Sequence, residues 1–298
     1  MEDNAPSPLL ADRRLRSALR QAREGIALTQ GQVAEISGWS VGKMQRIESG
    51  AGPIAEADLR HLAEVYRLGV SQADRLVTLG RAARRPGWWQ ELRGSVPSRY
   101  LHYVGLEAGA ESLAFYSNVA VSGLLQTTDY SDAIIGATAL TSLSQEDLTT
   151  RRDLRKRRRK EILDRVDPPT LRVLLDESVL YRVVGDATVM SGQISWLIEL
   201  ARRPHIDLKV VPFEAGPSGW NQPMIVLSFG EADQPALYLE GWGQAEVVDL
   251  PEKVLAARQA YEELWTKALD TSESVGMLRL AAARYENGLL PRRWPMIG

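Results

Sequence analysis

The stretch LTQGQVAEISGWSVGKMQRIESG, residues 28–50, contains the signals of two short helices joined by a tight turn. Thr29 is a good N-cap for a first helix that we expect to run to about Ile36, because its hydroxyl can accept a hydrogen bond from a first-turn N–H. Gly38 can take the left-handed conformation that a sharp turn requires, and Ser40 can cap the next helix. The sequence therefore predicts a helical hairpin.

The second helix of this hairpin has one apolar and one polar face. Met44 and Ile47 are three residues apart, so both are expected to pack inward. The outward positions are Val41, Gly42, Lys43, Gln45 and Arg46. A helix with a polar outer face is what the major groove of DNA admits. A hairpin in any helical bundle needs the same caps, turn and spacing, so the pattern alone leaves DNA binding and plain structural packing both open.

The flanking sequence favours DNA binding. Apolar residues at helical spacing predict an all-α bundle of about five helices around the hairpin, and they are Leu15, Leu19, Leu59, Leu62 and Val65. The elements TQxxVA, Ser40, RIE and Gly50 stand at a characteristic spacing. On these residues the region 9–84 resembles the Cro/CI-type (Xre-like) helix-turn-helix DNA-binding domain of phage repressors.

The resemblance implies roles for individual residues. Positions matching Val41, Gly42 and Arg46 face base edges, and those matching Gln30, Lys43 and Gln45 lie near the DNA backbone or the groove wall. Arg46 is the best candidate for a bidentate contact to guanine, whereas Val41 offers only a methyl contact to thymine and Gly42 no side chain. The DNA-binding residues implied are Gln30, Ser40, Val41, Gly42, Lys43, Gln45 and Arg46.

Two further consequences follow from the same resemblance. Arg23 and Glu48 occupy positions where the family often has an internal ion pair, so they are expected to be scaffold. The loop after Gly50 lacks the lysines or arginines that some relatives use on phosphate. Each domain should therefore bind DNA weakly alone, which favours a homodimer on a two-fold symmetric operator.

Composition limits the other possibilities. The 298 residues have room for two domains, and the net charge of −2 confines nucleic-acid binding to a local face. The first 87 residues carry 13 basic and 10 acidic side chains. With no cysteine and only His61, His102 and His205, which lack ligand spacing, we expect no metal site and no cofactor. No signal peptide or long apolar run occurs, so a cytoplasmic, nucleoid-associated protein is expected.

The second half of the chain mixes strand and helix patterns after a linker at 85–99. We expect an α+β domain with a small mixed sheet. Its expected strands are 170–177, 206–213, 224–229 and 236–240, and its expected helices are 106–116, one capped by Asp129 and ending near Gly136, 144–163, 178–185, 190–201 and 251–269. The glycine- and proline-containing segment 214–223 fits either a mobile lid or a plain long hairpin connection.

A second resemblance covers this half. The segments LEAGAESLAFY, GLLQTTDY, RRRKEIL, LLDESVLYRVVG, VVPF and YLE resemble the C-terminal domain of unknown function that follows Xre-like domains in actinobacterial regulators. It implies a sensor or partner-binding domain at 100–272 and a tail at 273–298. Such proteins are thought to be transcriptional regulators, often encoded beside a small partner protein.

A dense basic run lies between Arg151 and Lys160, with eight basic residues and one acid. It is either a surface that faces DNA or an acidic partner, or a solvated helix whose long arginines cover apolar neighbours. Relatives usually carry fewer arginines here, which slightly favours the solvated helix.

Three functions remain for the second domain. It could accept a small molecule or a small partner protein as a signal, only bind a partner as the antitoxin half of a two-gene pair, or use strand-end carboxylates such as Asp176 as an enzyme. We expect no enzyme, because no histidine partner, phosphate loop or metal constellation accompanies these acids. For a ligand or partner site between the strand ends and the LLQT loop, the candidate residues are Gln126, Tyr130, Glu177, Trp220, Tyr238, Glu240 and Trp242.

Overall fold

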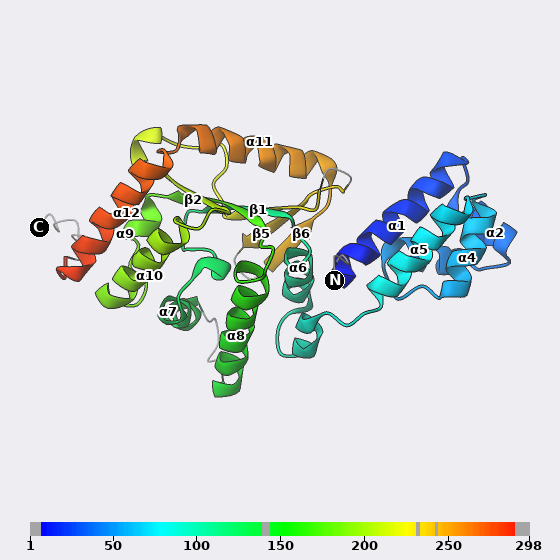
Figure 1. Cartoon of the computed structure of the whole chain (residues 1–298), viewed down its shortest axis with the longest axis horizontal. Coiled ribbons are helices and arrows are strands. Elements are labelled where there is room, and N and C mark those ends of the chain that lie inside the picture. Colours follow the sequence, from blue (N-terminus) through cyan, green and yellow to red (C-terminus); the bar gives the residue numbers. More distant parts are fainter. Residues whose placement is uncertain (1–6, 139–143, 231–232, 242–243, 290–298) are drawn as a thin grey trace, which may run out of the picture. The chain divides into compact units, whose positions relative to one another are not determined.

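A computed structural model describes residues 7–138, 144–230, 233–241 and 244–289. The chain forms two compact units (Figure 1). The first comprises the residues up to Glu91 together with Val104–Gly109, and the second comprises Leu92–Tyr103 and the residues from Ala110 onward. The expected linker at 85–99 holds a short 3-10 helix, Trp88–Leu92, and the start of helix α6.

The first unit contains the five helices that the sequence predicts: α1 Pro8–Gly25, α2 Gln30–Ser37, α3 Val41–Ser49, α4 Glu56–Val65 and α5 Val70–Ala83. Its core is built from the periodic apolar residues, including Leu15, Leu19, Leu59 and Leu62, which are all buried. Each short helix places its apolar stripe in this common core, because none of them could bury enough surface alone.

The second unit is built around a six-stranded mixed sheet of order β3-β2-β1-β4-β5-β6. The first three strands are mutually parallel, and β4, β5 and β6 follow as antiparallel neighbours. The strands are β1 Ser112–Ser117, β2 Thr170–Asp176, β3 Ile206–Val211, β4 Met224–Ser228, β5 Ala236–Gly241 and β6 Gln244–Val248. The α+β class with a small mixed sheet is thereby confirmed.

Helices cover both faces of this sheet (Figure 1). On one face α11 buries Val254, Ala257 and Tyr261 against Tyr116 and Leu174. The opposite face is covered by α7, α8 and α10. Helix α6 Ser98–Glu107 belongs to this unit only up to Tyr103. The other helices of this unit are α7 Thr128–Thr138, α8 Gln145–Arg158 with a π-helical turn Arg159–Leu163, α9 Ser178–Tyr181, α10 Ala187–Leu200, α11 Pro251–Lys267 and α12 Thr271–Glu286.

The expected helix at 106–116 is wrong. Helix α6 ends at Glu107, and Ser112–Ser117 is strand β1, in the middle of the sheet. Its Phe115 pairs with Val173 of β2 and with Ile225 of β4. Leucine and alanine favour a helix locally, but strand pairing on both sides overrides that preference and buries the aromatic residues.

Three smaller expectations also change. Asp129 lies inside the first turn of α7, and the Thr127 hydroxyl accepts the hydrogen bond from Tyr130 N (3.3 Å), as a cap would. The segment 214–223 is no hairpin, because β2 and β1 separate β3 from β4 in the sheet. Strand β6 was not expected at all.

Among the described residues, no helix is long and apolar enough to cross a membrane.

Candidate functional site

The helical hairpin has the caps and turn that the sequence predicts. The Thr29 hydroxyl accepts from Gln32 N and the Gln32 side chain accepts from Thr29 N, which completes a capping box at the start of α2. Gly38 has φ 66°, in the left-handed region, and the Ser40 hydroxyl accepts from Lys43 N at 3.2 Å. These contacts fix the residue at which α3 begins and the turn that joins it to α2.

Helix α3 divides into a buried and an exposed face. Met44 and Ile47 are buried in the core of the helical unit. Val41 is 48% exposed, and Gln45 and Arg46 are also exposed. The outer face thus presents a guanidinium and an amide, which can hydrogen-bond to base edges in a major groove, and a small apolar group, which can contact a thymine methyl.

Glu48, on the inner side of α3, joins three helices. Its carboxylate accepts hydrogen bonds from Arg23 Nε of α1 (2.6 Å) and from Gln30 Nε2 of α2 (2.8 Å). Burial acts to raise the pKa of Glu48, but the hydrogen bonds from Arg23 and Gln30 outweigh it and hold that pKa below its ordinary value. The expected Arg23–Glu48 ion pair is confirmed, and the amide of Gln30 lies on this scaffold.

Lys43 is also engaged within the unit. Its Nζ lies 2.7 Å from Asp58 Oδ1 of α4 and 3.7 Å from the ring centroid of Trp39. The lysine that the resemblance places near the DNA backbone is therefore held by an acid. Asp58 was not found by sequence reasoning, since nothing in the local pattern around either residue links positions 43 and 58.

A second buried arginine secures the end of α3. Arg16 of α1 donates to the carbonyls of Ile47 and Gly52 and pairs with Asp12 (2.7 Å). Cations stabilise the carbonyl end of a helix, so Arg16 fixes the C-terminal turn of α3 and the loop behind it. The only sequence signal for this role was the position of Arg16 on the same helix as Arg23.

In the second unit, Gln126 of the LLQT loop and Tyr130 of α7 both bond to the backbone of Val121. The Gln126 amide donates to Val121 O (2.6 Å), and its Oε1 accepts from Arg155. Tyr130 is buried, and its hydroxyl accepts from Val121 N at 3.3 Å. Burial raises the pKa of Tyr130.

The other candidate residues are dispersed. Glu177 accepts from Phe213 N (2.7 Å), and Trp220 donates to Gln222 O (2.7 Å) while packing on the core under α11. Tyr238 is buried and stacks on Tyr103 with ring centroids 3.8 Å apart. Glu240 is exposed on β5. Trp242 lies outside the described residues.

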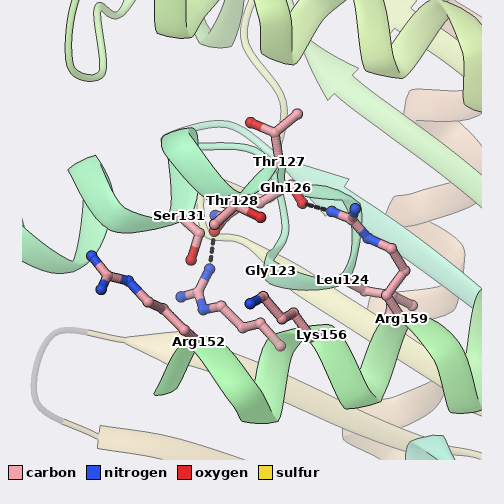
Figure 2. A pocket seen from close by; sticks show the side chains of 10 residues that line it. Gly123, Leu124, Gln126, Thr127, Thr128, Ser131, Arg152, Lys156 and Arg159 are labelled. Carbon is pink, nitrogen blue, oxygen red and sulfur yellow. Dashed lines mark hydrogen bonds between the residues drawn. The ribbon is translucent and has the colours of Figure 1, made fainter. Parts of the chain in front are cut away.

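A cavity opens between the LLQT loop and helix α8, and Figure 2 shows its lining. One side is formed by residues of the segment 123–128 and by Ser131 at the start of α7. The other side is formed by four cations: Arg152, Arg155 and Lys156 of α8, and Arg159 at the start of the π-helical turn that follows it. Six of the seven candidate ligand residues are described, and of these only Gln126 lines this cavity.

The basic run therefore does not act as one surface. Four of its cations turn to the cavity, whereas Arg158 is buried and donates to the hydroxyls of Tyr100 (2.6 Å) and Tyr103 (3.2 Å). Lys160 is exposed, as a solvated helix predicts. No group of three or more potential metal-ligating side chains occurs in the described part of the chain.

Comparison with known families places both units. Residues 14–76 match a helix-turn-helix domain, and residues 100–280 match a domain of unknown function (DUF5753). The chain belongs to the DUF5753 family. This DUF5753 protein thus combines an N-terminal helix-turn-helix domain with a C-terminal domain of unknown function, which fits the Xre-like regulators that its sequence resembles. Neither the curated proteins nor the solved structures contain a significant match to it.

Loss of the Glu48 charge should destabilise the helical unit of this DUF5753 protein. We expect Glu48→Gln to lower the free energy of unfolding by about 3 kcal/mol in urea titrations of the full chain at pH 7, because Arg23 loses its charged partner in a buried place. Glu24→Gln is the control, since Glu24 also contacts Arg23 (3.2 Å) but is 58% exposed, and it should cost under about 1 kcal/mol.

The same pair gives a pH dependence. Because the folded-state pKa of Glu48 lies below the ordinary value of 4.5, its stabilisation is present above that pH and is lost as the pH falls through the folded-state pKa. The stability gap between the wild type and Glu48→Gln should therefore narrow on acidification. A gap that stays constant between pH 7 and pH 3 would contradict the assignment.

Removal of Asp58 should release Lys43 for DNA. We expect Asp58→Ala to strengthen binding to DNA of any sequence and to steepen the plot of log K against log salt by about 0.9 for one further phosphate contact. Asp74→Ala, which makes the same charge change at an exposed position of α5, serves as the control. Equal salt slopes for both variants would show that Lys43 does not reach the backbone.

Proposed function

We propose that the protein is a sequence-specific transcriptional regulator that binds a two-fold symmetric operator as a homodimer in the cytoplasm, on the nucleoid. The observation that carries this proposal is the outer face of α3. Arg46 is exposed there, beyond a scaffold in which Glu48, Arg23 and Arg16 hold the helix from its inner side. A helix held in this way can enter the major groove without reorganising.

Weak contacts in each copy support the dimer. Gly42 offers no side chain, Lys43 is paired with Asp58, and the loop after Gly50 has no cation. One domain therefore neutralises few phosphates, and specific affinity requires a second copy. Two-fold symmetry places the two recognition helices about 34 Å apart, on successive turns of the same face of the duplex.

The C-terminal domain, in this proposal, receives the signal. The cavity beside α8 supports a small molecule as that signal, because a small concave site with convergent polar groups suits such a ligand. The alternative is an antitoxin-like regulator whose C-terminal domain only binds a small partner protein. A stoichiometric small protein that copurifies with the chain would favour that alternative.

We also propose that the domain is not an enzyme. Asp176 accepts from Ser178 N (2.9 Å) and Glu177 from Phe213 N, as loop and cap residues do. Glu240 lies on β5, three strand positions from β2 in the sheet. This separation corresponds to about 14 Å at the usual strand spacing, which is wider than paired carboxylates need for glycoside chemistry.

The role of Arg46 can be tested directly. We expect Arg46→Ala to weaken binding to the cognate operator by about 1–3 kcal/mol and to relax the preference at one base pair of each half-site, because a bidentate contact to guanine is lost. Binding is measured by titration of labelled operator and of operators changed at single positions.

The matched control is Arg75→Ala, which removes the same charge from an exposed position of α5. It should change affinity little and specificity not at all. If Arg46→Ala and Arg75→Ala have the same affinity and the same base preferences as the wild type, the assignment of α3 as the reading helix is wrong.

A further inference from the structure

The cavity between the LLQT loop and α8 carries more positive charge than its surroundings balance. Arg152 pairs with Asp132 (2.8 Å). Arg155, Lys156 and Arg159 form no ion pair with any described carboxylate, and Lys156 makes no hydrogen bond to a described residue either. Three cations thus converge on one small site without an ion-pair partner among the described carboxylates.

Two of these cations are partly withdrawn from water. Arg155 donates to the side-chain oxygen of Gln126, and Arg159 donates to its backbone oxygen. Burial lowers the pKa of both guanidinium groups. Glu240 acts on Arg155 only through space, and Asp164, the acid that acts on Arg159, is paired with Arg203 at 3.0 Å. Partly buried charges that have no opposite charge in an ion pair are costly, so the arrangement favours an anionic ligand.

Ser131 provides an independent indication. It is only 4% exposed, it lines the cavity, and its Oγ has no hydrogen-bond partner among the described residues. Figure 2 shows its side chain between α7 and the cations of α8. A buried hydroxyl without a partner costs stability, which a ligand oxygen would restore. The cavity also lies at the start of α7, at Thr128, where the helix dipole favours negative charge.

We propose that this site binds a phosphoryl group. The cavity of about 120 Å³ fits one tetrahedral oxyanion and opens to solvent, so the group can be free phosphate or the phosphate of a larger metabolite. A phosphoryl group carries about two negative charges and three acceptor oxygens, which match three cations and a hydroxyl better than a single carboxylate does. This inference rests on the proposed role of the C-terminal domain as the receiver of a signal.

The direct test is calorimetric titration of the full chain in phosphate-free buffer at constant ionic strength. The ligands are inorganic phosphate, a phosphate monoester such as glycerol 3-phosphate, and acetate. We expect phosphate or the monoester to bind with a Kd below about 1 mM, and acetate to bind at least tenfold more weakly. Tighter binding of the monoester would identify a phosphorylated metabolite as the source. A Kd above 1 mM for both would overturn the inference.

Two variants distinguish phosphate binding in the cavity from a general electrostatic attraction of anions to surface lysines. Lys156→Gln should weaken phosphate binding about tenfold, because one charge-assisted contact is lost. Lys160→Gln, which removes an exposed lysine four residues further on and outside the cavity lining, should stay within about twofold of the wild type. Equal affinities for the two variants would overturn the inference.

Ser131→Ala tests the role of the Ser131 hydroxyl through two measurements, phosphate affinity and Tm, which a purely structural role would not change in the same way. It should weaken phosphate binding and raise the Tm of the ligand-free chain, since it removes a buried hydroxyl that has no partner. A lower Tm with unchanged phosphate affinity would overturn the assignment of Ser131.

Operator titrations then separate this inference from the proposed function. If phosphate binds and operator affinity is unaffected, the site stands and the signalling role fails. If no anion binds while the operator is still recognised, the inference fails and the DNA-binding function stands. If Lys156→Gln weakens operator binding in phosphate-free buffer and Lys160→Gln does not, α8 contacts DNA and the inference fails.

Discussion

The carboxylate of Glu48 is the contact on which the DNA-binding face depends. It is buried on α3, accepts a hydrogen bond from Arg23 of α1, and accepts another from Gln30 of α2. Because it ties α3 to both α1 and α2, α3 has one orientation in the bundle. Removing one partner of a buried ion pair costs far more free energy than replacing both partners by apolar residues. Any arrangement of the helices that separates Glu48 from Arg23 is therefore disfavoured.

The helical unit could be predicted closely because its signals are local. Thr29, Gly38 and Ser40 each act on a backbone group within a few residues, and Met44 and Ile47 define a buried face by their spacing alone. Strand β1 could not be predicted in the same way. Its residues favour a helix locally, and only pairing with β2 and β4, more than 50 residues away in sequence, decides their conformation.

The functional residues also differ in whether local sequence or tertiary packing decides their role. The exposure of Arg46 follows from helical periodicity, whereas the pairing of Lys43 with Asp58 depends on how α4 docks. The sequence showed a basic run at Arg151–Lys160, but periodicity does not say which cations meet an acid. That depends on the packing of α8 against the LLQT loop, which leaves three cations around Gln126 and Ser131 without an ion pair to a described carboxylate.

In the proposed function, the protein reads DNA through a small face on α3 and receives its signal in a separate domain. The most direct measurement is a hydroxyl-radical footprint of the full chain on its cognate operator. The account predicts two protected, two-fold related half-sites centred about one helical turn, or a whole multiple of a turn, apart. A single asymmetric protected stretch, or no sequence-specific protection, would contradict it.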